Sequence, residues 1–188
     1  MTRKVRTDAA GNHAHIVSTA RAAIAADGVD LPMREIARRA GLGVATLYRH
    51  FPTRTDLIGA ALAGQVAACR AGMRAAQAEP DAWSALSGAI RQFAEHQIRA
   101  PGLNAVLLGS HPAGDAFRDD RRANAAALER LVDRAHQQRV LRRGTSLADV
   151  RVVLTAISSL RPTPATRRPD AIRTLLPLLL AGLRSPDR

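Results

Sequence analysis

Apolar residues recur every three or four positions along most of the chain, with charged side chains between them. This spacing places the apolar residues on one face of an α-helix, and no segment alternates apolar and polar positions as a half-buried strand does. Gly and Pro residues divide the pattern into separate segments. The chain is therefore predicted to be all-α, with helices over about residues 12–27, 33–40, 44–51, 53–79, 81–99, 103–109, 115–139, 146–160 and 170–183.

The stretch over residues 32–57 holds two short amphipathic segments around one glycine. Gly41 ends the first segment, because glycine adopts the left-handed conformation found after a helix at no steric cost. Only Leu42 and Gly43 separate the two segments. The pair is predicted to form a helix-turn-helix, which places its second helix in the major groove of DNA.

Two side chains are expected to cap helices near this motif. Asp30 is a candidate cap for the helix over residues 33–40, since Pro32 has no side-chain acceptor. Thr53, with Asp56 three residues later, forms an approximate capping box at the start of the long helix.

Several short matches make residues 6–60 resemble the TetR family of bacterial transcriptional regulators. They are Ile36-Ala37, Ala40-Gly41 and the run Thr46-Leu47-Tyr48-Arg49-His50-Phe51-Pro52. The resemblance implies a three-helix DNA-binding domain with an N-terminal basic arm over residues 1–55, and a helical effector-binding and dimerisation domain over residues 56–188. Within the family, Gly43-Val44, Phe51 to Arg54 and Pro101 to Leu103 are most similar to the SbtR-like branch.

Residues in the first turn of a groove-bound helix face the base edges, and here these are Val44, Ala45 and Thr46. Of the three, only Thr46 can form side-chain hydrogen bonds, while the others can touch thymine methyl groups. Polar readout is therefore expected from Arg34, whose matching position in some relatives contacts guanine, and from Arg49.

The family resemblance implies that Tyr48, His50 and Arg54 contact phosphates. Relatives often carry Arg where this chain has Gly11, His13 and His15, so phosphate contacts near the start of the first helix are expected to be fewer, or binding to be more dependent on pH. The basic arm, with Arg3, Lys4 and Arg6, either follows DNA or is a disordered tail.

Two apolar stripes mark the C-terminal helices. The stripes over residues 146–160 and 170–184 resemble the family's four-helix interface, which implies a homodimer. The alternative is that both stripes bury in the core of one chain. Pro177 is expected to kink the last helix.

The effector pocket is expected to lie in the C-terminal domain, lined by large or polar residues of an Ala-rich body. No Cys/His cluster has metal-ligand spacing, so neither a metal nor another cofactor is expected. Cys69 is the only cysteine, which excludes an intramolecular disulfide and favours a cytoplasmic protein. The candidate wall residues are Phe93, His96, Leu107, His111 and Phe117, with Leu103, Val106 and Leu128 beside them.

The formal charge of +12 rests on 28 basic residues, of which one is Lys. Arginine suits phosphate and guanine recognition, although a GC-rich genome also enriches Arg and Ala. Motifs of hydrolases, metalloproteases and nucleotide-binding enzymes are missing, so an enzyme is not expected. The sequence favours a repressor that binds a palindromic operator and is released by a small molecule. The alternative is an arginine-rich helical protein that binds nucleic acid without sequence preference or acts as an adaptor.

Overall fold

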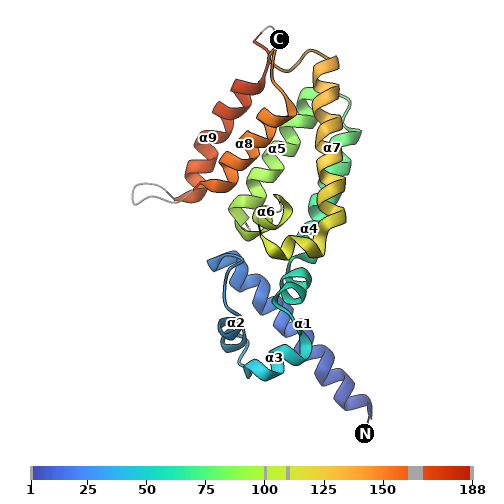
Figure 1. Ribbon diagram of the computed structural model, residues 1–188, viewed down its shortest axis with the longest axis vertical. Coiled ribbons are helices and arrows are strands. Elements are labelled where there is room, and N and C mark those ends of the chain that lie inside the picture. The colour runs from blue at the N-terminus through green and yellow to red at the C-terminus, as the bar shows by residue number, and fades with distance from the viewer. Residues whose placement is uncertain (1, 100, 109–110, 161–166, 187–188) are drawn as a thin grey trace. The chain divides into compact units, whose positions relative to one another are not determined.

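A computed structural model describes residues 2–99, 101–108, 111–160 and 167–186 (Figure 1). These residues form helices joined by short turns, which confirms the predicted all-α class. Apart from one isolated bridge between Leu141 and Arg184, they contain no β-structure, and none of their helices is long and apolar enough to cross a membrane. The elements are α1 (Thr2–Asp27), α2 (Met33–Arg39), α3 (Val44–His50), α4 (Arg54–Ala78), α5 (Ala82–Arg99), α6 (Pro101–Leu108), the 3₁₀ helix η1 (Pro112–Phe117), α7 (Arg118–Gln137), α8 (Leu147–Ser159) and α9 (Arg168–Leu183).

The helices gather into two compact units. Unit 1 contains Met1–Val66 together with Ala100–Arg118, and unit 2 contains Ala67–Arg99 together with Asp119–Arg188. Helix α4 therefore contributes to both units. The domain boundary expected between residues 55 and 56 does not coincide with the division between the two packed units. As a boundary between functions, it stays a prediction.

Unit 1 packs α1, α2, α3, the first half of α4, α6 and η1 around apolar side chains. Helix α1 contacts α2 and α6, α2 contacts α3, and α6 contacts η1. Ala116 of η1 also lies against α4, because a Cβ added at Gly59 would meet the Ala116 Cβ at 3.5 Å. The large side chains that are fully buried in this unit are Ile16, Ile24, Ile36, Leu47, Leu57, Ile58, Leu62 and Leu103.

Two helices begin three or more residues away from the start that the sequence pattern predicts. Helix α1 starts at Thr2 rather than near Asn12, since no proline interrupts this segment and extending an existing helix costs little. The expected basic arm is therefore helical in its backbone. Helix α7 starts at Arg118, because the residues before it form the tighter η1. The side chains of residues 2–10, together with Gly109 and residues 161–166, lie outside the described residues.

The turn between α2 and α3 is closed by main-chain hydrogen bonds around Gly41. Gly41 has a φ of 66°, in the left-handed region. The amides of Gly41 and Leu42 donate to the carbonyls of Arg38 and Ala37 at 3.1 and 3.0 Å. These are the two bonds of a Schellman motif, and they confirm the helix-ending role predicted for this glycine.

Capping boxes begin α4 and α8. The Thr53 hydroxyl accepts from the Asp56 amide at 3.1 Å, and the Asp56 carboxylate accepts from the Thr53 amide at 3.0 Å, as predicted. Ser146 and Asp149 form the same reciprocal pair at the start of α8. Because each box satisfies amides that have no partner inside the helix, it fixes the residue at which the helix begins.

Unit 2 is built around α5, which contacts both α8 and α9. This packing buries the apolar stripe of α8, in which Val150 and Ile157 are 0% exposed. The central residues of this stripe are therefore buried within one chain, and a homodimer through the helices near residues 146–160 and 170–184 stays a prediction. The buried residues of the two helices are Val150, Val153, Leu154, Ile157, Ile172, Leu180 and Leu183.

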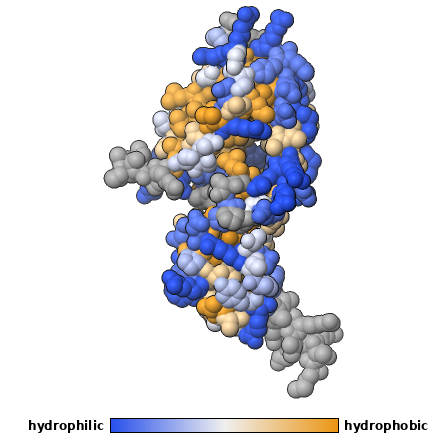
Figure 2. Space-filling model, in the orientation of Figure 1, coloured by the Kyte–Doolittle hydropathy of each residue, from blue (hydrophilic) through white to orange (hydrophobic). Residues whose placement is uncertain are grey.

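Two large apolar side chains of α8 and α9 stay on the surface. Val152 and Leu178 are each 66% exposed. Figure 2 shows hydrophobic residues gathered over these two helices. Helix α9 continues through Pro177, which is itself exposed and removes one amide donor from the helix.

Candidate nucleic-acid interface

Helix α3 presents an inward and an outward face. Leu47 and Phe51 are 0% and 3% exposed and anchor the helix in unit 1, whereas Val44 and Tyr48 are 40% and 44% exposed. Ala45 is exposed as well. The outward face is therefore available for a partner, as the predicted recognition helix requires.

The two polar candidates of α3 are bonded to each other. Arg49 Nη2 donates to the Thr46 hydroxyl at 2.8 Å. A hydroxyl has one donor and two acceptor positions, so Thr46 keeps its O–H for an acceptor on a base. The bond also holds the Arg49 guanidinium along the helix toward the turn that contains Val44 and Ala45.

The three arginines of α2 have different surroundings. Arg38 makes two hydrogen bonds to Glu35, at 2.8 and 2.7 Å, and Arg39 bonds to both Glu35 and Asp27, at 2.8 and 2.6 Å. Arg34 is exposed and takes no part in this network of described side chains.

This network also shifts the pKa of Glu35. The hydrogen bonds from Arg38 and Arg39 lower the pKa of Glu35 to about 2, so the carboxylate stays charged and keeps both guanidinium groups close. The pairing of Glu35 with Arg38 and Arg39 was not among the contacts expected from the sequence. The spacing of Glu35 to both, three and four residues on one helix, was the signal for it. Arg34 is the arginine of α2 that these ion pairs of described side chains leave out.

Arg54 takes part in the packing of unit 1. Its Nη2 donates to the Val29 carbonyl at 2.7 Å, which ties the start of α4 to the loop before α2. Arg21 Nε donates to the Ala61 carbonyl at 3.1 Å and ties α1 to α4 in the same way. A guanidinium has five donors, so the Val29 bond is compatible with the phosphate contact predicted for Arg54.

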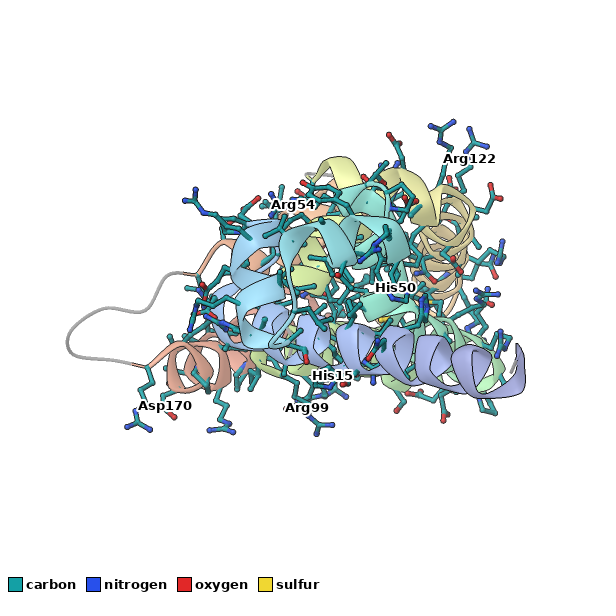
Figure 3. All side chains as sticks on the ribbon, turned by 90° about the horizontal axis from the view of Figure 1, so that it is seen from below. His15, His50, Arg54, Arg99, Arg122 and Asp170 are labelled. Atoms are coloured by element: carbon teal, nitrogen blue, oxygen red, sulfur yellow. The ribbon has the colours of Figure 1, made fainter. Side chains whose placement is uncertain are left out.

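Three histidines of unit 1 lie on α1 and α3. His15 Nε2 donates to the Ala40 carbonyl at 3.1 Å, at the turn of the helix-turn-helix. His50, at the end of α3, is half-buried, and its ring centroid lies 6.2 Å from that of His13. His15, His50 and Arg54 are labelled in Figure 3. The contact between the His13 and His50 rings was not expected from the sequence.

The five predicted pocket residues divide between the units. Phe93 and His96 belong to unit 2, and Leu107, His111 and Phe117 belong to unit 1. Phe117 is buried, and the other four are half-buried. Their role in binding a ligand stays a prediction.

His111 bonds to the loop before α2. Its Nε2 lies 3.2 Å from Asp30 Oδ1. The prediction that Asp30 caps α2 is therefore wrong: the helix begins after Pro32 without a side-chain cap, and the Asp30 carboxylate is a partner of His111 instead.

His96 lies beside the single cysteine. Its Nδ1 is 3.0 Å from the Cys69 sulfur. Burial raises the pKa of the Cys69 thiol to about 12 and lowers the pKa of His96, so both groups favour their neutral forms. A neutral buried thiol is a poor nucleophile, which favours a packing role for Cys69 over a redox-sensing one. Within the described ranges, no cluster of three or more His, Cys, Asp or Glu side chains could hold a metal ion.

Comparison with known proteins identifies relatives of this chain. Residues 16–61 match the model of the family described as bacterial regulatory proteins, tetR family. A TetR transcription regulatory protein from Mycobacterium vanbaalenii is 28% identical, with 96% of this chain and 99% of that chain covered and a TM-score of 0.56. A TetR transcriptional regulator from Streptomyces coelicolor is 29% identical over 93% and 99% of the two chains, again with a TM-score of 0.56.

A more distant structure shares the fold. A ketosteroid transcriptional regulator of Mycobacterium tuberculosis is 17% identical, covers 92% of this chain and 95% of its own, and has a TM-score of 0.67. No curated protein matches the sequence.

Proposed function

We propose that this chain is a DNA-binding transcriptional regulator of the TetR family and that it acts as a repressor released by a small-molecule effector. In this proposal it binds a palindromic operator as a homodimer in the cytoplasm. Regulators of this family are not enzymes. Within the family, Gly43-Val44, Phe51 to Arg54 and Pro101 to Leu103 support our placement in the SbtR-like branch.

The observation that carries the proposal is the exposed face of α3 beside an unpaired arginine of α2. Val44 and Ala45 offer methyl groups to thymine, and the Thr46 hydroxyl offers a donor to a base acceptor. Arg34 can bind guanine through two parallel hydrogen bonds, because the ion-pair network of α2 leaves it out. Tyr48, Arg49, His50 and Arg54 are then placed to hold the flanking phosphates or, for Arg49, a further base.

A homodimer is supported by the apolar surface of unit 2. Val152 and Leu178 are each 66% exposed on neighbouring helices that contact each other, and Leu175 and Leu179 are half-buried nearby in sequence. A second copy that packs the same surface against this one would form a symmetric four-helix interface. Two DNA-binding domains, or heads, one from each chain of the dimer, are needed because one short helix contacts few bases. A palindrome presents equal half-sites to them in successive major grooves.

Release by an effector requires that the bound molecule favour a conformation with lower DNA affinity, and DNA must then weaken effector binding by the same factor. We propose that the effector contacts Phe93 and His96 of unit 2; Leu107, His111 and Phe117 of unit 1 are a separate set of candidates. All five combine apolar or aromatic area with few polar groups, as small-molecule sites generally do. No metal or other cofactor is proposed for this site.

The test is a fluorescence-anisotropy titration against the DNA that flanks the protein's own gene, with a scrambled duplex of equal length as competitor. We expect a preference of roughly 10³ or more for the specific duplex. Arg34→Ala should weaken specific binding by about 1–3 kcal/mol per head. Arg38→Ala, which removes an arginine already paired with Glu35, is the matched control and should have a much smaller effect.

Equal affinity for both duplexes, lost at moderate salt, would support the alternative of non-specific nucleic-acid binding and contradict the operator. Sedimentation velocity tests the dimer separately. Val152→Asp combined with Leu178→Asp should give a monomer, whereas Leu108→Asp, at a 44% exposed position of α6, should not. A wild-type monomer at micromolar concentration would refute the proposed interface.

A further inference from the structure

Two histidines from different helices meet beside the end of the recognition helix. The His13 ring of α1 stacks on the Phe51 ring, with centroids 4.7 Å apart and an angle of 28° between the planes. His50, the last residue of α3, has its ring centroid 6.2 Å from that of His13. Phe51 is 3% exposed and therefore gives His13 a rigid support, while His13 is exposed and His50 half-buried.

The position of this pair relative to DNA follows from the motif. The recognition helix lies in the major groove, so the residues at its ends lie near the two phosphate backbones that border the groove. His50 is at such an end, and the Phe51 stack holds His13 next to it. Both rings can therefore reach the same stretch of backbone.

We propose that His13 and His50 form a phosphate-binding pair whose hold on the DNA backbone depends on protonation. This inference rests on the DNA-binding function proposed above and names a further site within it. Two positive imidazoles at this separation repel each other in the free protein, and an anionic phosphate between or beside them removes the repulsion. Binding of DNA is therefore coupled to uptake of protons by the pair.

Protonation also strengthens the support of His13. A charged imidazole over an aromatic face gains an electrostatic attraction that a neutral ring lacks. Imidazoles change charge between about pH 5 and 8, so the coupling falls in a range that a cell can reach. We therefore expect the affinity for DNA to be high at low pH and to fall as pH rises.

Most other charged and titratable groups on the neighbouring elements form hydrogen bonds or ion pairs with other residues. His15 donates through Nε2 to a carbonyl, a bond that both its neutral and its charged form can make. Among the described side chains, no carboxylate bonds to either imidazole of the pair. The neighbouring groups and their partners are Arg49 with Thr46, Arg54 with Val29, Asp56 with Thr53, and Glu35 with Arg38 and Arg39, while Tyr48 is exposed on α3.

The experiment is an anisotropy titration of the full chain with two fluorescein-labelled duplexes, one from the DNA flanking its gene and one scrambled, at pH 6, 7 and 8 and constant ionic strength. We expect the association constant to fall by about tenfold for each imidazole that releases its proton. His13→Phe combined with His50→Gln should remove this dependence, since Phe keeps the stack on Phe51 but carries no proton. His13→Arg should instead preserve affinity at pH 8.

His136→Gln is the matched control, because His136 is an exposed helical histidine of unit 2, and it should titrate as the wild type does. Circular dichroism at each pH shows whether every variant is folded. A folded double variant whose affinity falls with pH as steeply as the wild type overturns the proposed pair. If the affinity of the wild type for each duplex is the same at pH 6 and at pH 8, the pair is overturned but DNA binding is not. If the wild type binds neither duplex at pH 6, both DNA binding and the pair are overturned.

Discussion

Gly41 and Gly64 allow one chemical change to be tested in two backbone conformations. A Cβ added at either glycine meets no heavy atom within 4 Å, so steric crowding does not distinguish them. Gly41 has a φ of 66° after α2, whereas Gly64 lies within α4. Replacement by Ala should therefore destabilise the protein at Gly41 and stabilise it at Gly64, with the backbone as the cause of the opposite signs.

The magnitudes follow from the two conformations. An L-residue in the left-handed region costs roughly 1–2 kcal/mol, and the smaller conformational freedom of Ala in the unfolded chain returns about 0.4–1 kcal/mol. Gly41→Ala should thus lower the free energy of unfolding by about 1 kcal/mol. Gly64→Ala should raise it by about 0.5–1 kcal/mol, since Ala is the better helix former.

Urea unfolding followed by circular dichroism at 222 nm measures both changes. With a denaturant slope of about 2 kcal/mol/M, the midpoint should fall by about 0.5 M for Gly41→Ala and rise by a similar or smaller amount for Gly64→Ala. Hydrogen exchange across residues 33–51 localises the effect, because the amides of Gly41 and Leu42 close the turn. If Gly41→Ala proves as stabilising as Gly64→Ala, the left-handed turn and the reasoning from it are wrong.

Three further predictions use the caps and titrating groups described above. Thr53→Ala removes one partner of the capping box and should lower the free energy of unfolding by about 1 kcal/mol in the same urea assay, whereas an unchanged midpoint would mean that the box contributes nothing. Iodoacetamide should label Cys69 slowly at pH 8 until urea unfolds the chain, since burial raises the pKa of the thiol to about 12; rapid labelling of the folded protein would contradict this burial. Because the pKa of Glu35 is lowered in the folded state, its contribution to stability is present above about pH 4.5 and is lost as pH falls toward about 2. The difference in urea midpoint between wild type and Glu35→Gln should therefore shrink over that range, and a constant difference would show that the carboxylate does not titrate with the arginine network.

The features that the sequence predicted correctly depend on residues close to each other in the chain. Gly41 ends α2 and Thr53 begins α4 because the groups they bond lie within four residues. The burial of Leu47 and Phe51 is likewise explained by helical spacing alone.

The features that sequence reasoning missed depend on contacts between distant segments. The stripe of α8 has the same pattern whether α5 or a second copy covers it, so periodicity could not decide between them. His111 and Asp30 are 81 residues apart, and Cys69 and His96 are 27 apart, which is beyond any local signal. The pairing of His13 with His50 also required the packing of α1 beside α3.

The composition of unit 1 has a consequence for how the protein is made. Its residues are not continuous in the chain: Ala100–Arg118 join the N-terminal Met1–Val66 in one compact unit. During synthesis the ribosome delivers the helix-turn-helix first, but α6 and η1 emerge only after α5 has been translated. Buried side chains such as Leu103 and Val106 are then missing from the nascent head, and apolar surface on α1 and α4 stays open in the meantime. A gene fragment that stops at Val66 would leave the same surface open permanently, so this DNA-binding unit is expected to be a poor module for transfer to other proteins unless the later segment is carried with it.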